Sequence, residues 1–292
     1  MPFNLSKIAP FLFVWLWSTG FIGAKYGLPY IEPFFMLFLR FCFVILVFLI
    51  LIKIYQSTWL NRNQSIQQII VGTLIHGGYL GGVFFAIKLG VPAGITAIIV
   101  GLQPIITTVI GRLFLNQSLN TKQSIGLLLG FVGISLVILE NASIDTQNMN
   151  IFGLTACLVA LISISLGTLL QKQLASNVPL LTGSFYQYIG AIILISIVTF
   201  SVETQDVIFS TELFLAMSWL VIGLSVLAIL LLLYMIREGE VSKVTSYFYL
   251  VPPAAVFQSW LLFDERLGGW AIIGTILTVI GVVLVIKSNT NS

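Results

Sequence analysis

Charged residues are scarce in this chain of 292 residues, because Asp, Glu, Lys and Arg together make up only 8% of it. A typical soluble domain carries about 25% charged residues, so a water-facing surface cannot be built from this composition. Apolar residues account for 58% of the chain and recur in long runs. Runs of about 20 apolar residues cross a bilayer as helices, whose backbone groups are satisfied within lipid. We therefore expect an all-α membrane protein.

Cysteine and histidine are also few, which limits the chemistry available. The two cysteines, Cys42 and Cys157, lie inside apolar runs without the spacing of metal ligands, so we expect no disulfide, metal or other cofactor. No basic cluster of the kind that binds nucleic acid is present. The motifs HExxH, GxSxG and the P-loop are absent, so nothing indicates ATP-driven transport. The expected partners are the lipid bilayer and a small-molecule substrate.

The apolar runs are separated by turn and polar residues, such as the polar stretch 61–64. The first run leads directly into the others and lacks a small-residue cleavage site, so we interpret it as a retained helix. Ten spans are expected, at residues 8–26, 33–54, 67–88, 92–114, 121–140, 151–172, 179–200, 211–236, 241–263 and 268–287.

The stretch from Gly90 to Gly133 occurs twice in the chain, which is the mark of an internal duplication. The aligned pairs are Pro104–Pro252, Gln117–Glu265, Gly126–Gly274 and Gly133–Gly281 at a shift of 148 residues, and Gly20–Gly167, Lys25–Lys172 and Arg40–Gln187 at a shift of 147. We therefore divide the chain into two repeats, residues 1–148 and 149–292, with five spans each.

The distribution of lysine and arginine predicts the orientation. With a cytoplasmic N-terminus, nine of them lie at the inner side and three, Lys25, Lys88 and Arg266, at the outer side, which with Arg40 inside a span accounts for all 13. Short cytoplasmic loops carry the excess of positive charge, so this orientation is favoured. Because each half has an odd number of spans, the second half must be inverted, and both termini are expected in the cytoplasm. Inverted repeats place a pathway near the midplane, between the halves.

Two stretches carry a resemblance to a known family. PAGITAIIVGLQPIITTVIGRLFLNQSL in the first half and YFYLVPPAAVFQSWLLFDERLGGWAIIGTILTVIGVVLVI in the second are similar to the EamA family of the drug/metabolite transporter superfamily. The likeness covers nearly the whole chain, but Gln117 stands where the family usually carries glutamate. The resemblance implies ten helices, cytoplasmic termini and transport of small metabolites, often amino acids, with export as the direction favoured on family grounds.

His76 is the only histidine and lies near the middle of the span 67–88. A polar residue at this depth usually faces the bundle interior or a wet cavity. Its counterpart in the second half is Leu224, so His76 breaks the symmetry of the repeat, and Tyr79 lies one turn along on much the same face. We interpret both residues as substrate contacts, with proton coupling as a further role for His76. The alternative is a neutral histidine bonded to a neighbouring helix.

Arg40 lies within the span 33–54, roughly 10 Å below its outer end at the rise of an α-helix. Its planar guanidinium could bind a substrate carboxylate. It could instead extend toward Glu32 or Glu265, or cap carbonyls of a neighbouring helix. The structural role is favoured, because this arginine belongs to the general family pattern.

The other cavity candidates are aromatic or neutral polar residues inside the spans. Together they suit a modest-sized amphipathic solute better than a bare ion, although each one alone is more readily explained by packing. They are Trp15, Gln103, Ser163, Tyr186 and Tyr247.

Three residues are candidates for gating. Pro104 and Pro252 should each bend a span, because proline removes a backbone hydrogen bond and clashes with the preceding turn. Such a bend is either a gate or a simple packing kink. Glu265 lies in the outer turn after the span 241–263, where it forms either an ion-pair latch or a solvated turn. Repeated glycines in the spans 121–140 and 268–287 indicate either close packing of these two spans or a homodimer face.

The leading hypothesis is a multi-pass transporter of the cytoplasmic (inner) membrane that moves a small organic solute by alternating access. Proton antiport, exchange and facilitated diffusion all remain open. An intramembrane lipid-modifying enzyme is a second hypothesis, but it would need clustered acids, bases or metal ligands, and the chain has one histidine. A membrane scaffold that transports nothing is the third.

Overall fold

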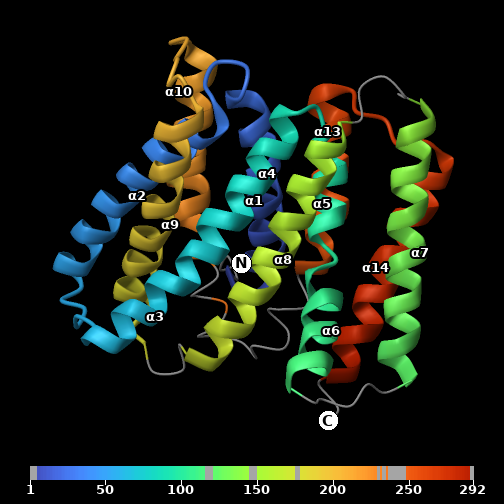
Figure 1. Ribbon diagram of the computed structural model, residues 1–292, viewed down its shortest axis with the longest axis horizontal. Coiled ribbons are helices and arrows are strands. Elements are labelled where there is room, and N and C mark those ends of the chain that lie inside the picture. The colour runs from blue at the N-terminus through green and yellow to red at the C-terminus, as the bar shows by residue number, and fades with distance from the viewer. Residues whose placement is uncertain are drawn as a thin grey trace.

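The computed structural model describes residues 5–115, 121–144, 150–174, 178–228, 231, 235 and 248–289, and this part of the chain is helical (Figure 1). The first half contains α1 (Leu5–Gly27), α2 (Pro33–Ile54), α3 (Arg62–Gly72), the π-helix η1 (Thr73–Gly78), α4 (Tyr79–Lys88), α5 (Ala93–Val100), α6 (Gln103–Leu115) and α7 (Thr121–Ile144). The second half contains α8 (Ile151–Leu174), α9 (Leu180–Val202), α10 (Thr211–Ser218), the π-helix η2 (Trp219–Ala228), the short 3₁₀-helix η3 (Phe248–Leu250), α13 (Val251–Phe263) and α14 (Gly269–Asn289).

Seven of the described helical stretches are long and apolar enough to cross a membrane, which confirms the all-helical membrane class. They are Ile8–Gly27, Pro33–Ile54, Arg62–Lys88, Ala93–Ile110, Ile151–Gln171, Leu180–Val202 and Thr211–Ala228. Three further apolar helices are shorter in the described part, at Thr121–Val137, Val251–Phe263 and Gly269–Leu284.

The third span starts at Arg62, five residues before the expected start at 67, so the break before it lies at residues 55–61. Asn61 is the N-cap of α3: its side chain accepts a hydrogen bond from the Gln64 backbone N–H at 2.9 Å, and its own N–H donates to the Gln64 side chain at 3.2 Å. This reciprocal capping box satisfies two of the donors that a helix leaves open at its start. The polar residues therefore begin the third span.

The two prolines predicted to bend spans each lie at the start of a helix. α5 ends at Val100 and α6 begins at Gln103, so Pro104 lies in the first turn of α6. Pro252 likewise lies in the first turn of α13, directly after η3. Proline is tolerated in a first turn because its missing N–H would have no partner there. The span Ala93–Ile110 is therefore interrupted directly before Pro104, and the gating role of the two prolines stays a prediction.

Helices of the two halves pack on one another in matching pairs. α7 packs along α14 and α2 along α9, which are counterparts in the repeat, and α5 packs along α13, the counterpart of α6. Figure 1 shows α7 and α14 side by side at one end of the molecule. α1 contacts both η2 and α13, and its counterpart α8 contacts both η1 and α6. Each half therefore supplies the same kind of packing partner to the other.

The glycines of α7 and α14 explain their close approach. A Cβ on Gly133 would collide with the backbone oxygen of Gly274, and a Cβ on Gly281 would collide with that of Gly126. Because the early glycine of one helix meets the late glycine of the other, the two helices run antiparallel. Small residues allow backbones to pack this closely in a membrane. The glycines thus serve packing within the chain, and the homodimer through these helices stays a prediction.

Both halves carry a π-helical segment at the same place in the repeat. A shift of 148 residues places Thr73–Gly78 inside Trp219–Ala228. The wider turn of a π-helix changes which side chains share a face, and such turns are frequent at functional sites. η1 carries His76 and η2 carries Ser225.

Candidate functional site

A cavity of about 110 Å³ lies between helices of both halves. For comparison, a buried apolar cavity of about 150 Å³ admits a benzene molecule. The space is somewhat smaller than that, so as it stands it admits only a small group of atoms. Its lining residues come from α1, α2, η1, α4, α8, α9 and η2: Trp17, Gly20, Phe21, Arg40, Ile75, His76, Tyr79, Leu80, Val83, Phe84, Ile164, Tyr188, Leu224 and Ser225.

Among the described residues of this lining, Arg40 is the only charged side chain, and it is 4% exposed. Its Nε and Nη2 atoms donate to Ser225 Oγ at 3.3 and 3.1 Å. It reaches neither of the acids considered for it, because Glu32 accepts from the Gln205 backbone and Glu265 pairs with Lys25. Of the alternatives considered for Arg40, the one in which it extends to Glu32 or Glu265 is therefore not the arrangement seen.

His76 and Tyr188 form the aromatic wall beside Arg40. The two rings stack with centroids 4.4 Å apart and planes 12° from parallel. His76 lies beside the Gln187 side chain, whose Nε2 donates to Gln68 Oε1 at 2.7 Å and to Gln171 Oε1 at 2.8 Å. The imidazole therefore lies beside both a neighbouring ring and a chain of amides, as expected of a polar group buried in a membrane.

Ser225 joins the two sides of the site. Its Oγ accepts from Arg40, accepts from the Tyr188 hydroxyl at 3.5 Å, and donates to the Leu220 carbonyl at 3.2 Å. A hydroxyl oxygen has two lone pairs, whereas three N–H or O–H groups point at this one. The serine alone therefore cannot satisfy the guanidinium.

Gln103, Pro104 and Pro252 line a second cavity of about 70 Å³. It shares Trp17, Phe21 and Tyr79 with the first cavity, so the two spaces adjoin. The Gln103 Nε2 atom donates to Thr168 Oγ1 at 2.7 Å. The breaks at the two prolines therefore border the site.

Three of the predicted residues lie away from the main cavity. Trp15 is 46% exposed on the outer face of α1, where it packs on Phe257. Tyr186 packs against Trp59, with ring centroids 6.3 Å apart. Ser163 is buried against Gly78 without lining the cavity. Tyr247, like Gln117, lies outside the described residues.

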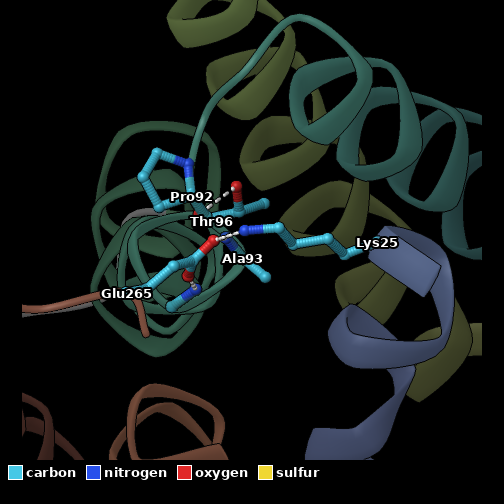
Figure 2. A network of polar contacts seen from close by, with 6 residues as sticks. Lys25, Pro92, Ala93, Thr96 and Glu265 are labelled. Carbon is cyan, nitrogen blue, oxygen red and sulfur yellow. Dashed lines mark hydrogen bonds and ion pairs between the residues drawn. The ribbon is translucent and has the colours of Figure 1, made fainter. Parts of the chain in front are cut away.

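Glu265 forms a latch between the halves at one end of the bundle. Figure 2 shows its carboxylate between the ammonium of Lys25, with which it pairs, and the start of α5. It also accepts from the backbone N–H groups of Ala93 and Gly94 at 3.3 and 3.4 Å. The Lys25 ammonium lies 4.5 Å from the centre of the Phe263 ring, a favourable cation–π contact. The latch therefore ties α1 and α5 to the turn after α13.

Asp264 and Arg266, which flank Glu265, form an exposed ion pair at 2.9 Å. Their side chains are 73% and 74% exposed, whereas that of Glu265 is 14% exposed. An exposed pair contributes little to stability. The interpretation as a solvated turn therefore fits Asp264 and Arg266 and does not fit Glu265.

Two further carboxylates cap helix starts from a distant part of the chain. Glu203 accepts from the backbone N–H groups of Phe34 and Phe35 at 2.9 and 2.7 Å, at the start of α2. Glu140 accepts from the Ala271 N–H at 2.5 Å, at the start of α14. A negative charge at a helix N-terminus is stabilising. Burial nevertheless raises the pKa of Glu203, and the two backbone hydrogen bonds oppose this rise.

Some residues of the site escaped the sequence analysis. Trp17, Tyr188 and Ser225 all line the cavity. Two of them directly follow the repeat counterpart of a candidate residue. Tyr188 follows Gln187, the counterpart of Arg40, and Ser225 follows Leu224, the counterpart of His76. Comparing each candidate with its repeat partner, and extending by one residue, would have found two of the three.

Several known proteins of similar sequence are named as transporters. The EamA-like transporter family matches residues 7–139 and 151–287. An uncharacterized transporter of Bacillus subtilis, YvbV, is 31% identical over 204 residues, which are 69% of this chain and 64% of that protein. A probable amino-acid metabolite efflux pump of Escherichia coli is 25% identical over 290 residues, covering 92% of this chain and 91% of the pump.

A solved structure described as "Crystal structure of protein" has the same fold. It superposes with a TM-score of 0.66 at 18% sequence identity, covering 96% of this chain and 95% of the other. Both halves of the chain match the family model. The chain belongs to the EamA-like transporter family, within the drug/metabolite transporters.

Proposed function

We propose that this protein exports a small organic solute by alternating access between two inverted five-helix halves, with the cavity around Arg40, His76 and Tyr188 as the solute site. The observation that carries the proposal is the position of this cavity. It is lined by both halves, it has a volume of about 110 Å³, and it contains buried polar groups in the middle of apolar helices. Such groups in a membrane usually mark a substrate path.

The inversion of the halves is supported by the packing of α7 on α14. These helices are counterparts in the repeat, and they run antiparallel through the contacts Gly133–Gly274 and Gly126–Gly281. Inverted repeats allow one half to rock against the other around a fixed central site. The Glu265–Lys25 latch is then the gate at the end away from the termini, which the positive-inside rule places outside the cytoplasmic membrane.

The direction and the solute class come from the relatives. Two of them, from Escherichia coli and Salmonella typhimurium, are named as probable amino-acid metabolite efflux pumps. Each is matched over 92% of this chain, so the whole transport unit is shared. We therefore propose export of amino acids or related metabolites across the cytoplasmic membrane, with both termini in the cytoplasm.

Flux measurements in proteoliposomes test this function. The panel contains amino acids, their deaminated acids, nucleosides and vitamins, each with and without a pH gradient. We expect one class to cross faster than in empty vesicles, and His76→Ala to slow it about tenfold, the equivalent of about 1.4 kcal/mol. Trp15→Phe, on the outer face of α1, is the matched control and should leave the rate unchanged. Rates equal to empty vesicles for every class would favour a scaffold or an enzyme instead.

A further inference from the structure

Arg40 carries a buried positive charge whose hydrogen-bonding capacity is not filled. A guanidinium has five N–H donors. Only Nε and Nη2 have partners in the described chain, and both donate to the same oxygen, Ser225 Oγ. Nη1 has no hydrogen-bond partner among the described residues, and no carboxylate of that part of the chain pairs with Arg40. A charge that is 96% removed from solvent normally requires a counter-ion.

The remainder of the cavity lining is neutral and mostly apolar. Trp17, Phe21, Leu80, Val83, Phe84 and Ile164 supply hydrocarbon and ring surface. The polar groups near Arg40 are the hydroxyls of Tyr79, Tyr188 and Ser225 and the imidazole of His76. The lining contains no Asp or Glu in the described residues, so it offers a negative partner neither to Arg40 nor to a positively charged solute group.

We propose that the solute is a small monocarboxylate with an apolar body of about one ring or one branched chain, bound through its carboxylate to Arg40. This inference rests on the proposed transport function and narrows its solute class. The planar guanidinium matches a carboxylate through two parallel hydrogen bonds. One arginine balances one negative charge, so a phosphate dianion would leave charge uncompensated in an apolar space.

The same geometry disfavours zwitterionic amino acids. Their carboxylate would occupy Arg40, but their ammonium group would enter a lining without any described carboxylate. Leaving a buried ammonium without a negative partner is unfavourable. The transported relatives of amino acids are therefore the deaminated acids, which keep the carboxylate and the apolar side chain.

Three ligands of nearly equal shape separate the charges. They are 3-methylbutanoate, which has the carboxylate alone, 3-methylbutanamide, which is neutral, and L-valine, which adds the ammonium. Binding to the purified full-length protein in lipid nanodiscs is measured by calorimetry. We expect 3-methylbutanoate to bind at least about tenfold more tightly than either of the others, as a charge-assisted pair would give.

Variants of Arg40 test whether this residue supplies the preference. Arg40→Gln should abolish the tenfold difference between acid and amide, and Arg40→Lys should retain part of it through its charge. Tyr186→Phe, which lies away from the cavity, should keep the difference unchanged. If Arg40→Gln does not fold, the comparison of the three ligands on the unaltered protein decides the matter.

Several results would overturn the inference. They are equal binding of acid and amide, tighter binding of valine, binding of none of the three, or an acid preference that survives in Arg40→Gln. Flux separates these results from failure of the proposed function. If L-valine or the amide crosses proteoliposomes and the acid does not, the protein is a transporter and the carboxylate assignment is wrong. If no solute of any class crosses, the transport proposal itself fails.

Discussion

At the scale of single residues, the candidate site depends mostly on polar side chains inside apolar spans. His76, Tyr79 and Arg40 were predicted from sequence, because a polar side chain in lipid is unfavourable unless it faces the protein interior. The structure brings all three to one cavity. Their surroundings were not predictable: the Ser225 contact of Arg40 joins residues 185 positions apart.

The face that a helix turns inward was harder to predict than its existence. Trp15 and Trp17 lie two positions apart, and so point about 200° apart around an α-helix. Trp17 lines the cavity, whereas Trp15 is 46% exposed on the outer face. Because lipid-facing and inward-facing positions are both apolar in these spans, the sequence pattern contains little to distinguish them.

Glu203 allows a prediction about pH at the residue scale. Burial raises the pKa of its carboxyl above the ordinary value of 4.5, so the folded state favours the protonated form. The stability that this group contributes is therefore fully present below the unfolded pKa and is lost as the pH rises through the folded pKa. In Glu203→Gln this loss is absent. We expect the variant to gain melting temperature relative to the wild type between pH 4 and pH 7.

The matched control for this experiment is Glu212→Gln, which removes the same charge at an exposed position in the first turn of α10. The assignment would be contradicted if the difference in melting temperature between wild type and Glu203→Gln stayed constant from pH 4 to pH 7. It would also be contradicted if the wild type gained melting temperature relative to the variant as the pH rises. The two variants have the same net charge, so they form a matched pair. Their melting temperatures are measured in the same detergent and salt.

At the scale of elements, the repeat was the most informative feature of the sequence. It predicted that α7 and α14 correspond, and their glycines indeed meet in an antiparallel pair. The bounds of α2 were predicted to the residue, because Glu32-Pro33 begins the helix and Lys53 lies in its last turn. The breaks at Pro104 and Pro252 were predicted as bends, since a proline disrupts the helix N-terminal to it and does not show whether the chain resumes the same axis.

The π-helical segments could not be predicted, because periodicity arguments assume the same number of residues in every turn. Their wider turns bring His76 on η1 and Ser225 on η2 to the same cavity. The carboxylate caps were equally inaccessible, since Glu203 lies 169 residues from Phe34 in the chain. Contacts of this kind depend on the packing of the halves and leave no local pattern.

The glycine contact between α7 and α14 gives a prediction at this scale. Gly133→Ala introduces a Cβ that would overlap the backbone oxygen of Gly274, which cannot move unless the helices separate. We expect a loss of roughly 1–3 kcal/mol in stability, the usual range for overpacking. Thermal unfolding of the purified protein measures it.

Gly269→Ala is the control, because a Cβ at Gly269, the first residue of α14, meets no other atom within 4 Å. It should leave the melting temperature close to that of the wild type. Equal effects of the two substitutions would show that α7 and α14 do not depend on their close backbone approach.

At the scale of the whole molecule, the two halves resemble each other in their helices and packing. They differ in the residues that correspond to the Lys25–Glu265 latch. The latch joins Lys25 to Glu265, whereas the counterparts of these two residues in the repeated sequence are Lys172 and Gln117. A charged latch on one side and a neutral residue on the other would favour the conformation in which the latched end is closed. Movement of solute through the cavity then requires that the latch opens once in each cycle.

Locking the latch tests alternating access most directly. Lys25 and Glu265 are both replaced by cysteine in a protein whose own Cys42 and Cys157 are replaced by alanine, and a short, reducible bifunctional thiol reagent joins the new pair. The same reagent on cysteines at 264 and 266, within one exposed turn, is the control. The account predicts that solute flux in proteoliposomes stops in the cross-linked latch variant, returns after reduction, and never stops in the control. Flux that continues at full rate through the cross-linked latch would contradict it.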